Sequence, residues 1–187
     1  MPDLPRILVA TDGRETLDLP APLRGATFLR DLDIAQLVAV AGSANPPLGL
    51  DIDSVDGLNA DAAAVRFVME ELGIRVVLTR RPTIAARIAE AGGLALLHVF
   101  AFDSTGLGRT LEAHPGLAGS ARVGTVISPG PVLAHLSPLD LTRLPRPVVA
   151  YGLINTAPLA LTLLAHADAV LRRADCAIDT LRAGVPA

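Results

Sequence analysis

The chain has 187 residues, about half of them hydrophobic, and a formal net charge of −3. This length lies in the usual range of one domain and buries a core without disulfide bonds. With no Trp, one Tyr and four Phe, the core must consist of Leu, Val, Ile and Ala. All 16 basic residues are Arg, and the negative net charge excludes a long-range attraction for nucleic acid.

Neither a disulfide bond nor a membrane segment is expected. Cys176 is the one cysteine of the chain, which indicates a reducing compartment. Residues Met1–Arg6 are too short and polar for a signal peptide, and no apolar run approaches the ~18 residues of a membrane span. We therefore expect a cytoplasmic protein without membrane contact. The positive mean hydropathy indicates spare apolar surface, which a homo-oligomer would cover.

Short apolar runs follow one another along the chain. They have three to seven residues and are rich in Val, Ile and Leu, which is typical of buried parallel strands. In chain order they are Ile7–Ala10, Ala26–Leu29, Leu48–Ile52, Val76–Leu78, Leu94–Phe100, Val123–Ile127, Val148–Ala150 and Ala169–Leu171.

Helical segments separate these runs. The clearest are Asp61–Leu72, Ile84–Ala91, Leu107–Ala113 and Leu159–Ala165. Gly73 and Gly92 follow the first two, where a helix end favours glycine. Pro82 and Pro131 lie where the first turn of a helix tolerates proline.

Strands that alternate with helices form βα units and hence a parallel sheet. Eight is the number of strands that closes a barrel. The predicted fold is therefore α/β, a small (βα)8 TIM-type barrel in a single domain, residues 1–187. Because ~250 residues are typical of this fold, several helices must be short, especially after the first, second and sixth strands. An open doubly wound sheet is the alternative.

Polar residues cluster at the expected carboxyl ends of the strands, where both folds bind ligands. They are Asp12, Asp31, Asp33, Asp51, Asp53, Thr79, Arg80, His98, Asp103, Ser128, Asn155, Arg172 and Arg173. Residues two apart in a strand share a face, so Asp51 and Asp53 are expected to point the same way. Such residues are also ordinary in a soluble barrel, where Asp often caps the next helix.

A phosphate site is the most specific expectation for these ends. Gly130 and Gly152 follow the sixth and seventh strands, where backbone N–H groups can approach an anion closely. Phosphate sites in this fold commonly use the loops after strands seven and eight, which fits Gly152–Thr156 and the pair Arg172-Arg173. No Walker A sequence, zinc set or nucleophile elbow is present, so we expect no cofactor and leave a metal open.

Six segments, in order, resemble a known family, the glycerol-3-phosphate-responsive antiterminators of bacterial glycerol-uptake operons. They are Asp31–Leu37, Asp51–Leu58, Leu78–Arg80, Phe100–Thr105, Ser128–Gly130 and Val148–Thr156. The resemblance implies a barrel that binds glycerol 3-phosphate, or a related small phosphate, at its mouth and acts on leader mRNA to prevent termination.

The resemblance also implies a set of ligand-binding residues, to which the phosphate-loop argument adds Arg172. The residues carried over are Asp31, Asp53, Thr79, Arg80, Asp103, Gly130 and Gly152. A guanidinium group such as that of Arg80 pairs with phosphate oxygens through bidentate hydrogen bonds.

The sequence departs from the family pattern at several positions. It has Asp56 where the family has a basic residue and Val126 where it has an acidic one. It has Tyr151 where the family has a first glycine, and Arg172-Arg173 where the family has small hydroxyl residues.

Two other functions stay open. Carboxylates at the strand ends are also the general acids and bases that a small barrel enzyme would need to act on a phosphorylated metabolite. Alternatively, the spare apolar surface would serve a protein partner. The leading prediction is a ligand-sensing regulator rather than an enzyme.

Overall fold

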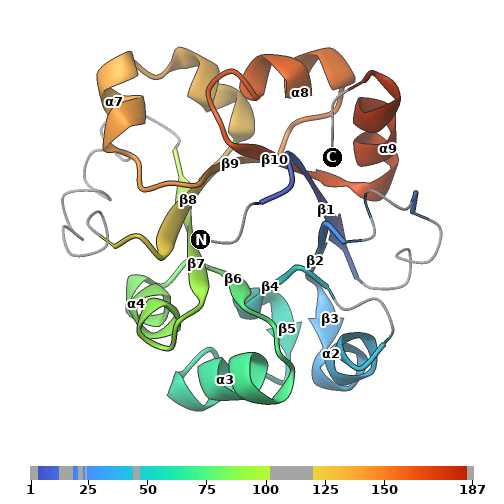
Figure 1. The fold of residues 1–187 in the computed structure, drawn as a ribbon, viewed down its shortest axis with the longest axis vertical. Helices are drawn as coiled ribbons and strands as arrows, with labels where there is room; N and C mark the ends of the chain where they lie inside the picture. Colours follow the sequence, from blue (N-terminus) through green and yellow to red (C-terminus); the bar gives the residue numbers. More distant parts are fainter. Residues whose placement is uncertain are drawn as a thin grey trace.

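The computed structural model describes residues 4–12, 19, 20, 23, 25–43, 47–101 and 120–184. Parallel strands close into a barrel in the order β1-β10-β9-β8-β7-β6-β4-β2, and helices lie around this ring (Figure 1). The barrel strands are β1 (Ile7–Thr11), β2 (Thr27–Leu29), β4 (Gly49–Asp51), β6 (Val76–Thr79), β7 (Leu94–Phe100), β8 (Val123–Ser128), β9 (Val148–Tyr151) and β10 (Ala169–Arg173). A separate two-stranded sheet joins β3 (Leu32–Asp33) to β5 (Val55–Asp56).

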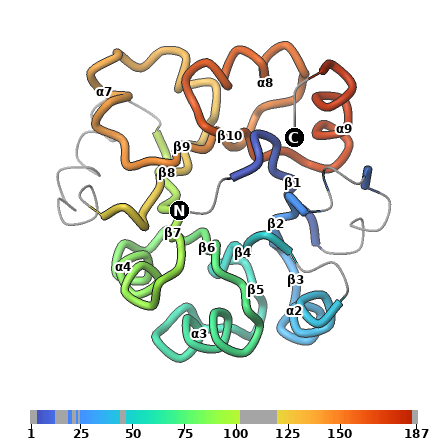
Figure 2. The backbone as a smooth tube through the Cα atoms, in the orientation of Figure 1, coloured from blue at the N-terminus to red at the C-terminus, as the bar shows by residue number. Residues whose placement is uncertain are grey.

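Every apolar run that was predicted as a strand contributes one strand of the barrel. In Figure 2 the chain passes once around the ring from blue to red, and β1 accordingly pairs with both β2 and β10. The closed (βα)8 barrel is thereby confirmed, and the alternative of an open sheet is wrong.

The helices are short, as the length of the chain requires. They are α2 (Ile34–Ala41), α3 (Ala62–Arg66), α4 (Pro82–Glu90), α7 (Pro138–Arg143), α8 (Ala157–Leu163) and α9 (Ala174–Arg182), with the short non-α helical segments η2 (Ile52–Ser54), η3 (Phe67–Glu71) and η4 (Gly130–His135). None of the helices within the described ranges has the length and apolar character that a bilayer span needs.

Three of the four predicted helices are confirmed, and the fourth, Leu107–Ala113, lies outside the described residues. Asp61 begins the first of them, because its side chain accepts hydrogen bonds from the N–H groups of Ala63 and Ala64. Gly73 and Gly92 follow the first two helices with φ of +70° and +86°, as expected of helix ends.

Two apolar layers follow from the alternation of side chains along the strands. One layer fills the barrel and includes Leu8, Phe28, Leu78, Leu96, Val126, Val149 and Leu171. The other lies between the barrel and the helices and includes Val9, Leu29, Val77, Leu97, Ile127, Ala150 and Val170. This alternation also decides which polar side chains at the strand ends point into the mouth of the barrel and which point toward the helices.

Candidate functional site

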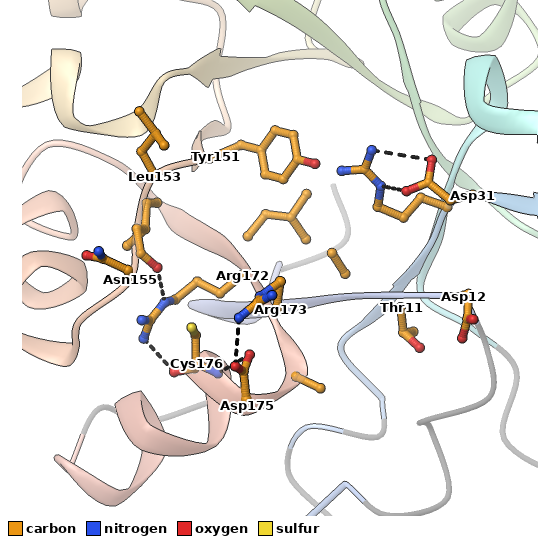
Figure 3. A pocket seen from close by; sticks show the side chains of 16 residues that line it. Thr11, Asp12, Asp31, Tyr151, Leu153, Asn155, Arg172, Arg173, Asp175 and Cys176 are labelled. Carbon is orange, nitrogen blue, oxygen red and sulfur yellow. Dashed lines mark hydrogen bonds and ion pairs between the residues drawn. The ribbon is translucent and has the colours of Figure 1, made fainter.

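A cavity of about 920 Å³ opens at the carboxyl ends of β1, β2, β9 and β10 (Figure 3). It lies where the sequence predicted a phosphate site, at the ends of the seventh and eighth barrel strands. Its lining residues are Ala10, Thr11, Asp12, Arg30, Asp31, Tyr151, Gly152, Leu153, Ile154, Asn155, Leu171, Arg172, Arg173, Ala174, Asp175 and Cys176.

The loop after β9 forms one wall of this cavity. Gly152 and Leu153 have φ of +73° and +58°, so two consecutive residues occupy the left-handed region. The Leu153 side chain is 75% exposed, so packing does not hold it in this conformation. Within the described part of the chain, the N–H groups of Leu153, Ile154 and Asn155 donate no hydrogen bond to a backbone carbonyl. These groups remain available to an anion in the cavity.

The first turn of α9 forms the facing wall. Arg173, Ala174, Asp175 and Cys176 line the cavity, so the positive end of the α9 dipole lies at this wall, and the N-cap residue Arg173 supplies no side-chain acceptor to the helix. Arg173 instead forms an exposed ion pair with Asp175 (2.8 Å). The hydrogen bond from the Cys176 N–H (2.8 Å) is the main reason that the pKa of Asp175 lies below its usual value.

Arg172 connects the loop after β9 to the first turn of α9. Its side chain is buried: Nε donates to the Ile154 carbonyl (2.9 Å), and Nη1 donates to the Cys176 carbonyl (2.5 Å) and to Thr180 Oγ1. Figure 3 shows the guanidinium group between the loop that carries Asn155 and the helix end that carries Cys176. Burial lowers the pKa of Arg172, and no described carboxylate forms an ion pair with it.

The third side of the cavity carries Arg30, Asp31 and Tyr151. Arg30 lies over the Tyr151 ring, 5.4 Å from its centroid, and its Nε donates to Asp31 Oδ2 (2.7 Å). Asp31 has a φ of +54°, and its N–H donates to Ser54 Oγ (3.1 Å). The cavity therefore has cationic groups on opposite sides, Arg30 here and Arg173 on α9.

A second polar network lies beside the cavity and is centred on Asp53. The Asp53 side chain is only 1% exposed, and its Oδ2 accepts from Thr79 Oγ1 (3.0 Å) and from the Arg80 N–H (2.6 Å). The guanidinium groups of Arg80 and Arg81 approach it at 3.6 and 3.4 Å. Through Oδ2 this carboxylate holds the β6 end in place, whereas its buried Oδ1 has the Arg81 ion pair but no hydrogen-bond partner among the described residues.

The predicted site residues thus fall into separate groups. Asp31, Gly152 and Arg172 line the cavity, whereas Asp53, Thr79 and Arg80 belong to the adjacent network. Gly130 is buried, and its N–H donates to the Gly152 carbonyl (3.1 Å), so this N–H holds the loop instead of facing a ligand. Asp103 lies outside the described residues.

The sequence did not select Arg30 as a site residue, because Phe28 and Leu29 are both apolar and the direction of the strand's side chains follows only from the structure. Phe28 fills the barrel interior and Leu29 the outer layer, so the next residue, Arg30, returns to the inner face at the mouth. Asp175 and Cys176 had no comparable signal, because they belong to the first turn of a helix. As for a metal, the described residues hold no group of three or more His, Cys, Asp or Glu side chains that could bind one.

Comparison with known proteins places this geometry in context. A family model described as "Glycerol-3-phosphate responsive antiterminator" matches residues 25–172. A glycerol uptake operon antiterminator-related protein from Thermotoga maritima is 23% identical, with a TM-score of 0.78 over 95% of this chain and 99% of that chain. A glycerol uptake operon antiterminator regulatory protein from Listeria monocytogenes is 22% identical, with a TM-score of 0.75 over 89% and 90%.

The same barrel occurs in an enzyme. A deoxyribose phosphate aldolase from Aeropyrum pernix is 18% identical, with a TM-score of 0.62 over 95% of this chain and 88% of that chain. At these identities the structural matches show the fold alone. No curated protein matches the sequence. The family model covers most of the barrel, from the start of β2 to the end of β10, and the chain belongs to the glycerol-3-phosphate-responsive antiterminator family.

Proposed function

We propose that this protein senses glycerol 3-phosphate and that the liganded barrel acts on leader mRNA as a regulator, not as an enzyme. The phosphate group would lie between the Gly152–Asn155 loop and the first turn of α9. The observation that carries this proposal is the cavity itself, which has unengaged backbone N–H groups on one wall and a helix N-terminus on the other. Both features favour a phosphate dianion.

The proposal gives different roles to Arg172 and Arg173, the two arginines at the end of β10. Arg173 is 79% exposed and lines the cavity, so its guanidinium group can exchange Asp175 for a phosphate oxygen. Arg172 would act indirectly, because its side chain is buried and its Nε and Nη1 already hold the Ile154 and Cys176 carbonyls. Its Nη2 is also buried and has no hydrogen-bond partner among the described residues. Its buried charge adds to the positive potential behind the cavity.

Thermal unfolding with added glycerol 3-phosphate tests the binding step. A ligand at a hundred times its Kd stabilises the folded state by about 2.7 kcal/mol, which for a chain of this size raises Tm by roughly 5–10 °C. Arg173→Gln should weaken binding, whereas Arg182→Gln should not. Arg182 is a matched control, since it is 78% exposed and lies at the other end of α9. An unchanged Tm at millimolar ligand would contradict the proposed site.

The RNA step needs its own measurement. With a net charge of −3 and no lysine, binding would rest on local groups of arginines, and it should weaken steeply as the salt concentration rises. Filter binding of the leader RNA, with and without glycerol 3-phosphate, should show higher affinity when the ligand is present. Equal affinities in both conditions would rule out a ligand-controlled RNA contact.

The structural similarity to an aldolase leaves the enzyme alternative open, but the sequence excludes one class of aldolase mechanism. An aldolase that forms a Schiff base with its substrate needs a lysine amine, and all 16 basic residues here are arginine. That chemistry is excluded for this chain whatever the similarity of the barrels. The homo-oligomer expected from the sequence stays a prediction, which sedimentation velocity would test.

A further inference from the structure

The mouth of the barrel contains a polar group of side chains that the phosphate site does not use. Above the apolar layer that fills the barrel, Asp51 pairs with Leu78 and His98 pairs with Val126, and both partners face inward. Paired residues of parallel strands point to the same side of the sheet, so Asp51 and His98 also face inward. Both keep part of their surface exposed, so a ligand in the mouth can reach them.

Asp51 and His98 border the cavity through Arg30 and Tyr151, which line it. The His98 and Tyr151 ring centroids are 5.5 Å apart, and the Arg30 guanidinium group lies over the Tyr151 ring. The pairs Phe28–Gly49 and Leu29–Leu50 place Arg30 beside Asp51 at the next step of the register. We call the four residues Arg30, Asp51, His98 and Tyr151 the mouth cluster.

The mouth cluster has unused hydrogen-bonding capacity. His98 Nε2 is buried and has no hydrogen-bond partner among the described residues. For the Asp51 side chain, the one hydrogen bond found in the described chain runs from the Asp53 N–H to Oδ1 (3.2 Å). A buried polar atom without a partner is costly and is rare in folded proteins, so it points to a group that binds there.

The charges of the cluster define what that group can be. Burial lowers the pKa of His98 to about 4, so its imidazole is neutral and offers one donor and one acceptor. Burial also raises the pKa of Asp51 to about 6, so this side chain is mainly a carboxylate at neutral pH. A neutral imidazole and a carboxylate that both face inward at the mouth suit the hydroxyl groups of a polyol, one of which can donate to the carboxylate while another exchanges a hydrogen bond with the ring. A ligand carboxylate would meet Asp51 as a like charge.

We propose that Asp51 and His98 are specificity residues, which bind the hydroxyl end of a phosphorylated polyol and reject the corresponding phosphorylated carboxylic acid. This inference rests on the proposed function, since it needs a phosphate held at the β9 and β10 ends of the same cavity. Tyr151 and Arg30 form the wall between the two ends. The phosphate thus anchors the ligand, and the mouth cluster distinguishes one phosphorylated compound from another.

Isothermal titration calorimetry at pH 7.5 with three probes tests the proposal: inorganic phosphate, glycerol 3-phosphate and 3-phosphoglycerate. The wild-type protein should bind glycerol 3-phosphate at least tenfold more tightly than either of the others. In Asp51→Asn the ratio of the Kd values for 3-phosphoglycerate and glycerol 3-phosphate should fall by roughly tenfold or more, because the amide no longer repels a carboxylate. The ratio is the readout, since removal of one negative charge strengthens the binding of every anion.

His98→Phe keeps an aromatic ring against Phe100 and Tyr151 but removes both ring nitrogens. It should weaken glycerol 3-phosphate by roughly tenfold and leave inorganic phosphate unchanged. His98→Gln, which retains a donor and an acceptor, should lose less and serves as the second variant if the Phe variant does not fold. Glu90→Gln is the control for loss of a carboxylate, because Glu90 is exposed at the C-terminal end of α4, away from the mouth.

The outcomes separate this inference from the proposed function. Suppose that phosphate and glycerol 3-phosphate bind, that Asp51→Asn leaves the Kd ratio of 3-phosphoglycerate to glycerol 3-phosphate unchanged, and that the His98 variants leave the Kd ratio of phosphate to glycerol 3-phosphate unchanged. The mouth cluster then has no role in specificity and the inference is wrong, while the phosphate site stands. If 3-phosphoglycerate binds the wild-type protein as tightly as glycerol 3-phosphate, the inference is again wrong. If no probe binds, the proposed function and the inference fail together.

Discussion

Replacing His98 with glutamine should make the protein more resistant to acid. Burial, with repulsion from Arg80 and Arg30, lowers the pKa of His98 from 6.5 to about 4. The unfolded chain therefore takes up a proton on this residue as the pH falls below 6.5, while the folded protein does not until about pH 4. The stability that the neutral ring contributes is present above pH 6.5 and is lost as the pH falls toward 4. At about 1.4 kcal/mol for each pKa unit, the loss is about 3 kcal/mol.

Asp51 has the opposite pH dependence and provides an internal comparison. Its pKa is raised from 3.8 to about 6, mainly by burial, while Arg30 opposes and Asp53 reinforces the shift. The stability from its protonated form is fully present below pH 3.8 and is lost as the pH rises through 6. Acidification from pH 7.5 to 4 should therefore increase the free energy of unfolding by roughly 2–3 kcal/mol through protonation of Asp51. In the wild-type protein the two effects nearly cancel.

Thermal melts at pH 7.5, 6, 5 and 4 would separate the two contributions. Relative to the wild-type protein, the Tm of His98→Gln should rise by roughly 6–12 °C between pH 7.5 and 4, and that of Asp51→Asn should fall by a similar amount. The double variant should follow the wild-type pH profile, since both opposing groups are gone. If the Tm of each single variant changes with pH as that of the wild-type protein does, the folded protein does not shift the pKa of His98 or of Asp51.

Two further predictions concern the residues that hold the site in place. Asp53→Ala removes the acceptor for Thr79 Oγ1 and the Arg80 N–H, and urea unfolding should show a loss of roughly 3–5 kcal/mol; a loss below 1 kcal/mol would mean that the network does not hold the β6 end. Arg172→Met should lower the midpoint of urea unfolding and also weaken inorganic phosphate binding by roughly tenfold, because the Ile154 and Cys176 carbonyls lose the guanidinium group that donates to both. Unchanged phosphate affinity would restrict Arg172 to a structural role.

Much of the fold could be predicted from local patterns alone. Each barrel strand is a short run of β-branched and aliphatic residues bounded by Gly, Pro or a helical segment, and these signals depend only on neighbours in the chain. The register was not accessible in this way, since it depends on which residues of two distant strands face each other. The pairing of His98 with Val126 and of Asp51 with Leu78 is a property of the closed ring, so the mouth cluster emerges only from the structure.

The candidate site shows where strand alternation applies and where it ends. β4 ends at Asp51 and the chain turns into η2, so Asp53 leaves the strand and faces the network at the β6 end instead of sharing a face with Asp51. In β10 the alternation does hold: Leu171 fills the barrel, and therefore Arg172 must point outward toward α9. The sequence could not set the phase of that alternation, because Val170 and Leu171 are both apolar and both buried, and only the structure shows which of them fills the barrel.

Two of the departures from the family pattern, Arg172 and Tyr151, have a structural explanation. A small hydroxyl residue in place of Arg172 could not reach the carbonyls of both Ile154 and Cys176, so the arginine adds a connection between the β9 loop and α9. Tyr151 in place of glycine supplies the ring that contacts His98 on one side and Arg30 on the other. Each change is at the cavity, and neither removes a backbone N–H group from it. In the proposed site the phosphate would bind those N–H groups, whereas the rest of the ligand would meet side chains such as Tyr151. The Tyr151 substitution would therefore alter the part of the cavity that distinguishes ligands, and the Arg172 substitution would support the loop that binds the phosphate.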